Sequence, residues 1–75
     1  MEDQLDLRGL KCPLPALMAR KALKALSPGD TLRVLASDPL AIVDIAHMCH
    51  QEGHVLVQSE RAPDHDRFLI RRGER

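Results

Sequence analysis

A cysteine followed by two prolines is the group in this sequence best suited to covalent chemistry. Cys12 precedes Pro13, Leu14 and Pro15, and proline favours the first turn of a helix, where its missing N–H removes no hydrogen bond. As the N-cap, Cys12 could accept a hydrogen bond from the N–H of Leu14, and the positive end of the helix dipole favours thiolate over thiol. We therefore expect a nucleophilic thiol with a lowered pKa.

The residues around this cysteine support the same hypothesis. Arg8 and Lys11 place positive charge near Cys12 and are expected to favour its thiolate form. Pro15 stands where a Cys-x-x-Cys redox site has its second cysteine, so Cys12 has no resolving thiol close by in the sequence. The alternative is that Cys12 is simply a small apolar residue before a helix.

Cys49, the second cysteine, is predicted to pack in the core. It shares one face of a predicted helix with Ile42, Ile45 and Ala46. If the two helices run parallel, Cys12 begins one and Cys49 lies far along the other, roughly 16 Å away at the rise of an α-helix. That separation exceeds the limit of about 7 Å for a disulfide, so we expect no bond between the two cysteines.

Three histidines near Cys49 raise the question of a metal site: His47, His50 and His54. At 100° per residue, the first two point well away from Cys49 on a helix. His54 follows Gly53, which is expected to end the helix. We therefore expect no metal and no other cofactor.

The elements that would position these residues follow from hydrophobic periodicity and from turn residues. We predict strands at 4–8, 31–37, 54–60 and 67–72, helices at 13–26 and from 39 to Gly53, and turns at 27–30 and 62–66. The order β-α-β-α-β-β, with right-handed crossovers, places both helices on one face of a four-stranded mixed sheet. The predicted fold class is α+β, a two-layer α/β sandwich.

Several finer expectations accompany this architecture. Asp38 is expected to be the N-cap of the second helix and Pro39 its first residue. In the third strand, Val55 and Val57 should face one side, against Leu56, Gln58 and Glu60 on the other. The apolar positions of the first helix are Leu14, Leu17, Met18, Ala22, Ala25 and Leu26. The open face of the sheet should carry Asp6, Arg8, Arg33, Gln58, Glu60, Arg67 and Arg71.

Length and composition limit the possible functions. The chain has 75 residues, which we interpret as a single domain over 1–75; at this size folding buries only roughly 60% of the unfolded surface, so chemistry is expected at the surface. Eleven basic and eleven acidic residues cancel, and Phe68 is the one aromatic, which disfavours direct nucleic-acid binding. No apolar run reaches membrane-spanning length and Met1–Arg8 does not resemble a signal peptide, so we expect a cytoplasmic protein without a membrane partner.

Nearly the whole chain resembles one known family. The residues concerned are Leu7 to Pro15, Arg20-Lys21, Ser27 to Asp30, Ser37 to Pro39, Asp44-Ile45, Cys49, Gly53-His54 and Leu69 to Arg71. In this order they are similar to the TusA/SirA-like sulfurtransferases, whose most specific feature is Cys-Pro-x-Pro after Gly-Leu-x.

The resemblance implies a sulfur carrier. Cys12 would receive a sulfane sulfur as a persulfide from a cysteine desulfurase and pass it to a downstream relay protein, while Pro13 and Pro15 shape the site. In the best-known pathway, this relay leads to 2-thiouridine at the wobble position of tRNA. Relatives in that pathway often carry Glu where this chain has Leu14; other relatives are associated with sulfur oxidation, molybdenum-cofactor assembly or selenium metabolism.

A carrier must dock on its partners, and the first helix offers a basic strip for this. Arg20, Lys21 and Lys24 follow Cys12 along the helix, with Leu17 and Asp38 at the rim of the same surface. The strip is equally compatible with an ordinary solvated helix face. Two other functions stay open at this stage: a thiol redox enzyme or peroxide sensor, and a regulatory module that transfers no sulfur.

Overall fold

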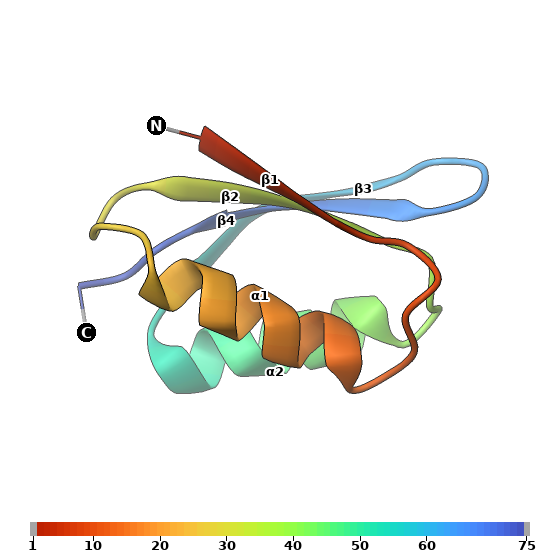
Figure 1. Cartoon of the computed structure of the whole chain (residues 1–75), viewed down its shortest axis with the longest axis horizontal. Helices are drawn as coiled ribbons and strands as arrows, with labels where there is room; N and C mark the ends of the chain where they lie inside the picture. The colour runs from red at the N-terminus through yellow and green to blue at the C-terminus, as the bar shows by residue number, and fades with distance from the viewer. Residues whose placement is uncertain (1, 75) are drawn as a thin grey trace.

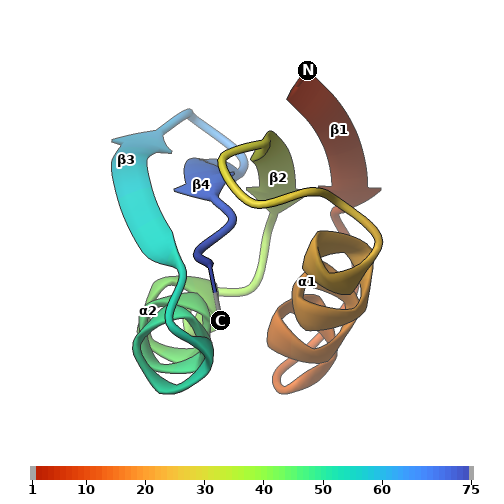
Figure 2. The same cartoon turned by 90° about the vertical axis from the view of Figure 1, so that its left-hand side faces the viewer.

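The structure, a computed structural model that describes residues 2–74, contains six elements in the predicted order (Figure 1). They are β1 (Glu2–Leu7), α1 (Leu14–Lys24), β2 (Thr31–Ala36), α2 (Ala41–Glu52), β3 (Val55–Arg61) and β4 (Asp66–Arg71). Both helices cover the same face of a four-stranded sheet, as Figure 2 shows. The predicted α+β, two-layer architecture is confirmed. Met1 and Arg75, the ends of the predicted domain, lie outside the described residues.

The sheet is mixed, and its strand order is β1-β2-β4-β3. β1 pairs with β2 in parallel, while β4 lies between β2 and β3 and is antiparallel to both. In this register Val34 of β2 lies opposite Phe68 of β4, and Leu32 lies opposite Ile70. The last strand in the sequence is therefore a central strand of the sheet.

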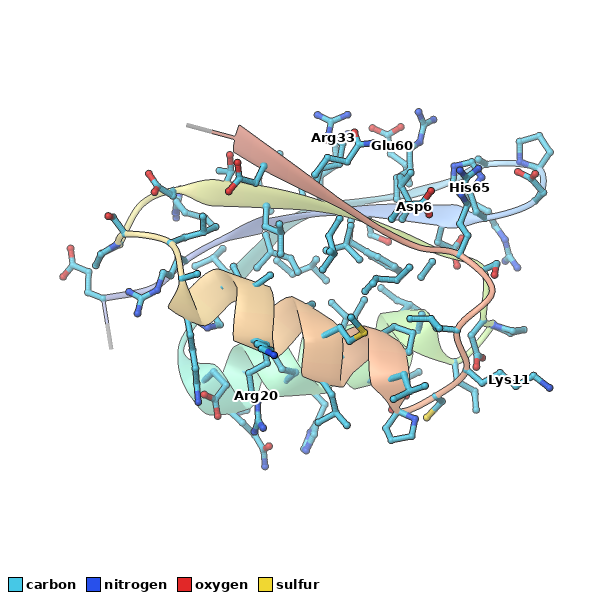
Figure 3. All side chains as sticks on the ribbon, viewed as in Figure 1. Asp6, Lys11, Arg20, Arg33, Glu60 and His65 are labelled. Carbon is cyan, nitrogen blue, oxygen red and sulfur yellow. The ribbon has the colours of Figure 1, made fainter. Side chains whose placement is uncertain are left out.

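The core fills the space between the sheet and the two helices. Alternate residues of β2 are buried, as expected for a sheet with one covered face. The largest fully buried side chains are Phe68, Leu23, Leu32, Ile45, Ile70, Val34 and Pro15. The opposite face of the sheet is polar; Figure 3 shows Arg33 and Glu60 projecting from it, away from the helices.

The buried face of α1 differs from the predicted one. Its buried residues are Pro15, Ala16, Ala19 and Leu23, whereas the predicted Leu14, Leu17 and Met18 are exposed. Small side chains at 16 and 19 let the helix approach the sheet closely, so the larger apolar residues are displaced to its rim. In α2 the prediction is partly correct, since Ile45 and Cys49 are buried but Ala46 is exposed.

The predicted alternation of β3 is interrupted by a bulge. Leu56 packs against the core, yet Gln58, two positions later, is exposed. The pairing of β3 with β4 shifts by one residue between Leu56 and Gln58, and a bulge of this kind re-aims the side chains that follow it. Val55 and Val57, which the alternation assigned to one face against Leu56, are both exposed on this edge strand.

The chain closes at the end of the molecule where the helices finish. Gly53 ends α2 in the left-handed conformation, with φ 77°, as predicted. The N–H of Gly73 donates to Nδ1 of His54 at 3.0 Å, and Nε of Arg72 donates to the carbonyl oxygen of Leu23 at 2.7 Å. A Cβ on Gly73 would overlap the carbonyl oxygen of Gly53, so this tail requires glycine.

Candidate functional site

The thiol of Cys12 lies at the end of the molecule where both helices begin. α1 and α2 run side by side in the same direction (Figure 1), so their N-terminal ends point to one side. Cys12 is exposed in the loop before α1. Figure 3 shows the neighbouring Lys11 projecting outward at this end. The thiol is therefore presented at a corner that another protein can reach.

Hydrogen bonds fasten the thiol loop to the loop between β2 and α2. The N–H of Cys12 donates to Oδ2 of Asp38 at 2.7 Å, and the N–H of Leu40 donates to Oδ1 of the same carboxylate at 2.8 Å. The N–H of Gly9 donates to Oγ of Ser37 at 2.8 Å. Asp38 thus joins the backbone of Cys12 to the start of α2.

The helix starts differ by one or two residues from the prediction. Pro13 is the N-cap of α1, which has no side-chain cap, and the N–H of Leu14 donates to the carbonyl oxygen of Lys11 at 2.9 Å. The expected bond from that N–H to the sulfur of Cys12 is therefore wrong. Likewise Leu40, not Asp38, is the N-cap of α2. A backbone acceptor within the turn takes the N–H that was assigned to the sulfur.

The predicted lowering of the Cys12 pKa is also wrong. A hydrogen bond with the carboxylate of Asp44 raises the pKa of the Cys12 thiol, and partial desolvation and the negative charges of Asp44 and Asp38 raise it further. Two carboxylates carry full charges, whereas a helix N-terminus offers about half of a positive charge. The local electrostatics therefore hold the proton on the sulfur.

Arg8 and Lys11 do not counter this effect. Nε and Nη2 of Arg8 donate to the two carboxylate oxygens of Asp6 at 2.9 and 2.8 Å. This fork lowers the pKa of Asp6 to about 2. The positive charge of Lys11 acts on Asp38, whose pKa is lowered chiefly by its bonds from Leu40 and Cys12. Arg8 is thus paired with Asp6, the charge of Lys11 acts on Asp38, and neither residue lowers the pKa of Cys12 as predicted.

A groove of about 180 Å³ runs between the two helices from the thiol end. Pro13, Leu17 and Arg20 line it from the side of α1, and Asp44 and His47 line it from α2. Arg20, one of its lining residues, projects from α1 on the side away from the sheet in Figure 3. The groove adjoins Cys12 through Pro13, the next residue.

The residues predicted for partner binding occupy two settings. Leu17 is 45% exposed, and Arg20, Lys21 and Lys24 are exposed along α1. Asp38 is half-buried, and both of its carboxylate oxygens bind backbone N–H groups. The basic strip is therefore open to a partner, whereas Asp38 holds the site together.

Three residues at the start of α2 were missed by the sequence analysis. Leu40 and Val43 are 56% and 63% exposed, and Asp44 is the main cause of the raised pKa of the Cys12 thiol. Because the predicted helices are parallel, the first turn of α2 must lie at the same end of the molecule as Cys12. The sequence could therefore have indicated that these residues lie near the thiol. Leu14 and Leu17 of α1, like Leu40 and Val43, are exposed apolar residues at the end of the molecule where both helices begin, and we call these four residues the thiol rim.

Cys49 is the opposite of Cys12 in its setting. It is 2% exposed, as predicted for a core residue, and burial raises the pKa of its thiol to about 11. Both cysteines are free.

The described residues contain no group of three or more His, Cys, Asp or Glu side chains placed to hold a metal ion. Within residues 2–74, neither helix has the length and apolarity to cross a membrane.

Comparison with known proteins agrees with this fold. The crystal structure of a SirA-like protein from Desulfitobacterium hafniense superposes with a TM-score of 0.82 at 26% sequence identity, covering 96% of this chain and 99% of the other. The family described as sulfurtransferase TusA matches residues 3–72, which include the thiol loop, both helices and all of β2 to β4. The chain belongs to the TusA family of sulfurtransferases.

Proposed function

We propose that this protein is a sulfur carrier that accepts a sulfane sulfur on Cys12 as a persulfide and delivers it to a second protein. The observation that carries the proposal is the exposed thiol at the shared end of two parallel helices in a TusA sulfurtransferase fold. Cys49 is buried, so Cys12 is the cysteine that a partner can reach.

The transfer requires only thiol exchange, which suits a small surface site. The Cys12 sulfur attacks the outer sulfur of a donor persulfide, the bond between the two donor sulfurs breaks, and the donor leaves as a thiolate. Cys12 then carries –S–SH, and an acceptor thiolate removes the outer sulfur by the same step. No electrons enter or leave the pair of proteins, so no cofactor is needed.

The donor and acceptor would dock on the thiol rim and the basic strip beside it. Leu14, Leu17, Leu40 and Val43 offer exposed apolar area around Cys12. Arg20, Lys21 and Lys24 extend this surface along α1, and their charge favours partners with acidic patches. A cysteine desulfurase is the proposed donor, and a downstream relay protein is the proposed acceptor.

For the pathway we propose the route to 2-thiouridine at the tRNA wobble position. Leu14 belongs to the exposed thiol rim, at the position where relatives in this pathway often carry Glu. We therefore expect Leu14 to influence which acceptor protein docks beside Cys12. Sulfur oxidation, molybdenum-cofactor assembly and selenium metabolism are the alternative destinations. A working thiol kept out of disulfides fits a reducing compartment, which favours the cytoplasm.

Intact-mass spectrometry after incubation with a cysteine desulfurase and cysteine tests the carrier role. We expect wild type and Cys49→Ser to gain one sulfur atom that reductant removes, and Cys12→Ser to gain none. A gain on Cys12→Ser, or none on wild type with several desulfurases, would contradict the proposal.

The pathway is tested separately in cells that lack their own carrier for tRNA thiolation. Expression of this protein should restore 2-thiouridine in digested tRNA, and Cys12→Ser should not. If the carrier loads sulfur in the first experiment but leaves tRNA unmodified, another destination is indicated.

A further inference from the structure

Asp44 has an unusual position for a carboxylate on the surface of a helix. It lies in the first turn of α2, and it lines the groove between the helices together with Pro13, the neighbour of Cys12. Its Oδ2 atom is buried and has no hydrogen-bond partner among the described residues. A buried polar atom without a partner calls for a functional or structural explanation, because leaving it unpaired is unfavourable.

The backbone around Asp44 shows that this placement is fixed. The N–H of Asp44 donates to the carbonyl oxygen of Leu40 at 3.1 Å. The N–H of Leu40 in turn donates to Asp38, the carboxylate that also holds the N–H of Cys12. The same short network therefore sets the positions of the Cys12 backbone and of the helix turn that carries Asp44.

Asp38 and Asp44 have different tasks in this arrangement. Both oxygens of Asp38 accept backbone N–H groups, so this carboxylate is already occupied. Asp44 has a buried Oδ2 atom without a hydrogen-bond partner among the described residues, and its side chain lines the groove that ends at Pro13, next to Cys12. Of the two acidic residues beside Cys12, Asp44 is the one able to receive a proton.

We propose that Asp44 is the proton acceptor for Cys12 during sulfur transfer. This inference rests on the proposed carrier function and names a second residue that takes part in the reacting site. A docked partner excludes water from the thiol, so the proton on sulfur needs an acceptor inside the interface, and a positioned carboxylate is such a group.

The step balances without any further reactant. The Cys12 S–H proton moves to the carboxylate of Asp44 while the sulfur attacks the outer sulfur of the donor persulfide. The donor sulfur–sulfur bond breaks, and the donor leaves as a thiolate, which takes up the proton from Asp44 or from solvent. In delivery, an acceptor thiol gives its proton to the carboxylate of Asp44 as its sulfur attacks the outer sulfur of the Cys12 persulfide. The sulfur–sulfur bond at Cys12 breaks, and the leaving Cys12 thiolate takes up this proton from Asp44.

Other charged groups near Asp44 and Cys12 also affect how the transfer rate depends on pH. Asp38 stands on the loop before α2, Arg20 faces the groove from α1, and His47 and Glu52 line it from α2. Glu52 lies two turns further along α2 than Asp44, in the same groove. It therefore offers a matched control for removing a negative charge without touching the thiol.

The test compares wild type, Asp44→Asn and Glu52→Gln in two assays across pH. Iodoacetamide alkylation of Cys12 reports the fraction of thiolate, because the small reagent needs no proton acceptor. Single-turnover transfer from a cysteine desulfurase loaded with one persulfide reports the docked reaction.

We expect opposite changes in the two assays for Asp44→Asn. At pH 7, alkylation should become several-fold faster because the thiol loses the carboxylate that holds its proton, while transfer should become about 10-fold or more slower, at the low end of general acid–base effects. The two transfer rates should converge at high pH, where the thiol is already ionised. Glu52→Gln should match wild type in both assays.

Other outcomes overturn the inference in distinct ways. If both rates rise in Asp44→Asn, the carboxylate only suppresses the thiolate and takes no part in transfer. If alkylation is unchanged or falls, Asp44 does not hold the thiol proton. If wild type itself accepts no sulfur, the carrier function fails, and the alkylation assay still shows whether Asp44 holds that proton.

Discussion

The two cysteines of this protein show how differently one fold treats the same chemical group. Cys12 stands on an exposed loop, with its N–H held by Asp38 and its thiol beside Asp44. Cys49 lies in the core on α2, 2% exposed. Both thiols have a raised pKa, yet the causes differ: carboxylates beside Cys12 and burial for Cys49.

The two cysteines show that the pKa of a thiol does not by itself decide whether the thiol can react. Burial protects Cys49 from reagents in solution and raises the pKa of its thiol by desolvation. The carboxylates beside Cys12 hold its proton as well, but the thiol is open to partners and the acceptor is at hand. A working cysteine here depends on access and on a destination for the proton rather than on a low pKa.

The largest expected effect is in the labelling of the native protein with iodoacetamide. Cys12 should react in the native state, at a rate limited by the raised pKa of its thiol. Cys49 should react only when the fold opens, because unfolding sets the free energy needed to expose it. For a domain stable by about 5 kcal/mol or more, the two rates should differ by about 10³-fold or more. Peptide mapping after timed labelling measures both sites, and comparable rates would contradict the buried position of Cys49.

A second prediction weakens the protection of Cys49 alone. Gly73→Ala places a Cβ against the carbonyl oxygen of Gly53, next to His54, whose N–H bonds the carbonyl oxygen of Cys49 at 2.8 Å. Overlap of this kind costs about 1–3 kcal/mol, so Cys49 labelling should rise roughly 10- to 100-fold.

Two comparisons check this result. Cys12 labelling of Gly73→Ala should be unchanged, because the tail lies at the other end of the helices. Glu74→Ala, the neighbouring exposed position, should leave both cysteines as in wild type. Equal labelling of Cys49 in Gly73→Ala and wild type would show that the tail relaxes without strain.

A third prediction concerns the anchor of the thiol loop. Asp38→Asn leaves one oxygen to serve two N–H donors, so the loop should loosen and the melting temperature at neutral pH should fall by a few degrees. The folded-state pKa of Asp38 is lowered, so its contribution is present above the usual carboxyl pKa and is lost as the pH falls through the lowered value. The difference in melting temperature between wild type and Asp38→Asn should therefore shrink in acid; a constant difference would exclude the ionised carboxylate as its source.

The smallest effect is expected from Arg8→Ala. The fork between Arg8 and Asp6 is exposed, and surface pairs contribute little to stability. The pKa of Asp6 should rise from about 2 toward its usual value, as NMR titration would show. The rate of Cys12 alkylation should change by less than about two-fold, because screening weakens the effect of exposed charges. A larger drop in this rate would support the original prediction that Arg8 favours the thiolate form of Cys12.

The fold could be predicted because the sequence changes its hydrophobic period at each boundary. Leu32, Val34 and Ala36 alternate with less buried residues, and Gly53 ends α2 as its type suggests. The buried face of α1 could not be predicted in the same way. Ala16 and Ala19 contribute little to a hydrophobic pattern, whereas the exposed Leu17 and Met18 dominate it.

The candidate site was predicted in place but not in its electrostatics. The proline-flanked motif located Cys12 before α1, where the structure has it. The acidity of the thiol depends on Asp38 and Asp44, which lie far from it in the sequence and reach it only through the parallel packing of α1 and α2. The helix dipole and the residues next to Cys12 in the sequence predict a lowered pKa, whereas Asp38 and Asp44, which are close to it only in the folded chain, raise the pKa.

The position of β4 between β2 and β3 has a consequence for how the chain matures. During synthesis, Val34 and Leu32 of β2 emerge long before Phe68 and Ile70, the residues that face them. Until residues 66–71 follow, β2 and β3 have unpaired edges and no shared neighbour, a state open to association with other chains. The sheet can therefore be completed only in a late step, once residues 66–71 have been synthesised.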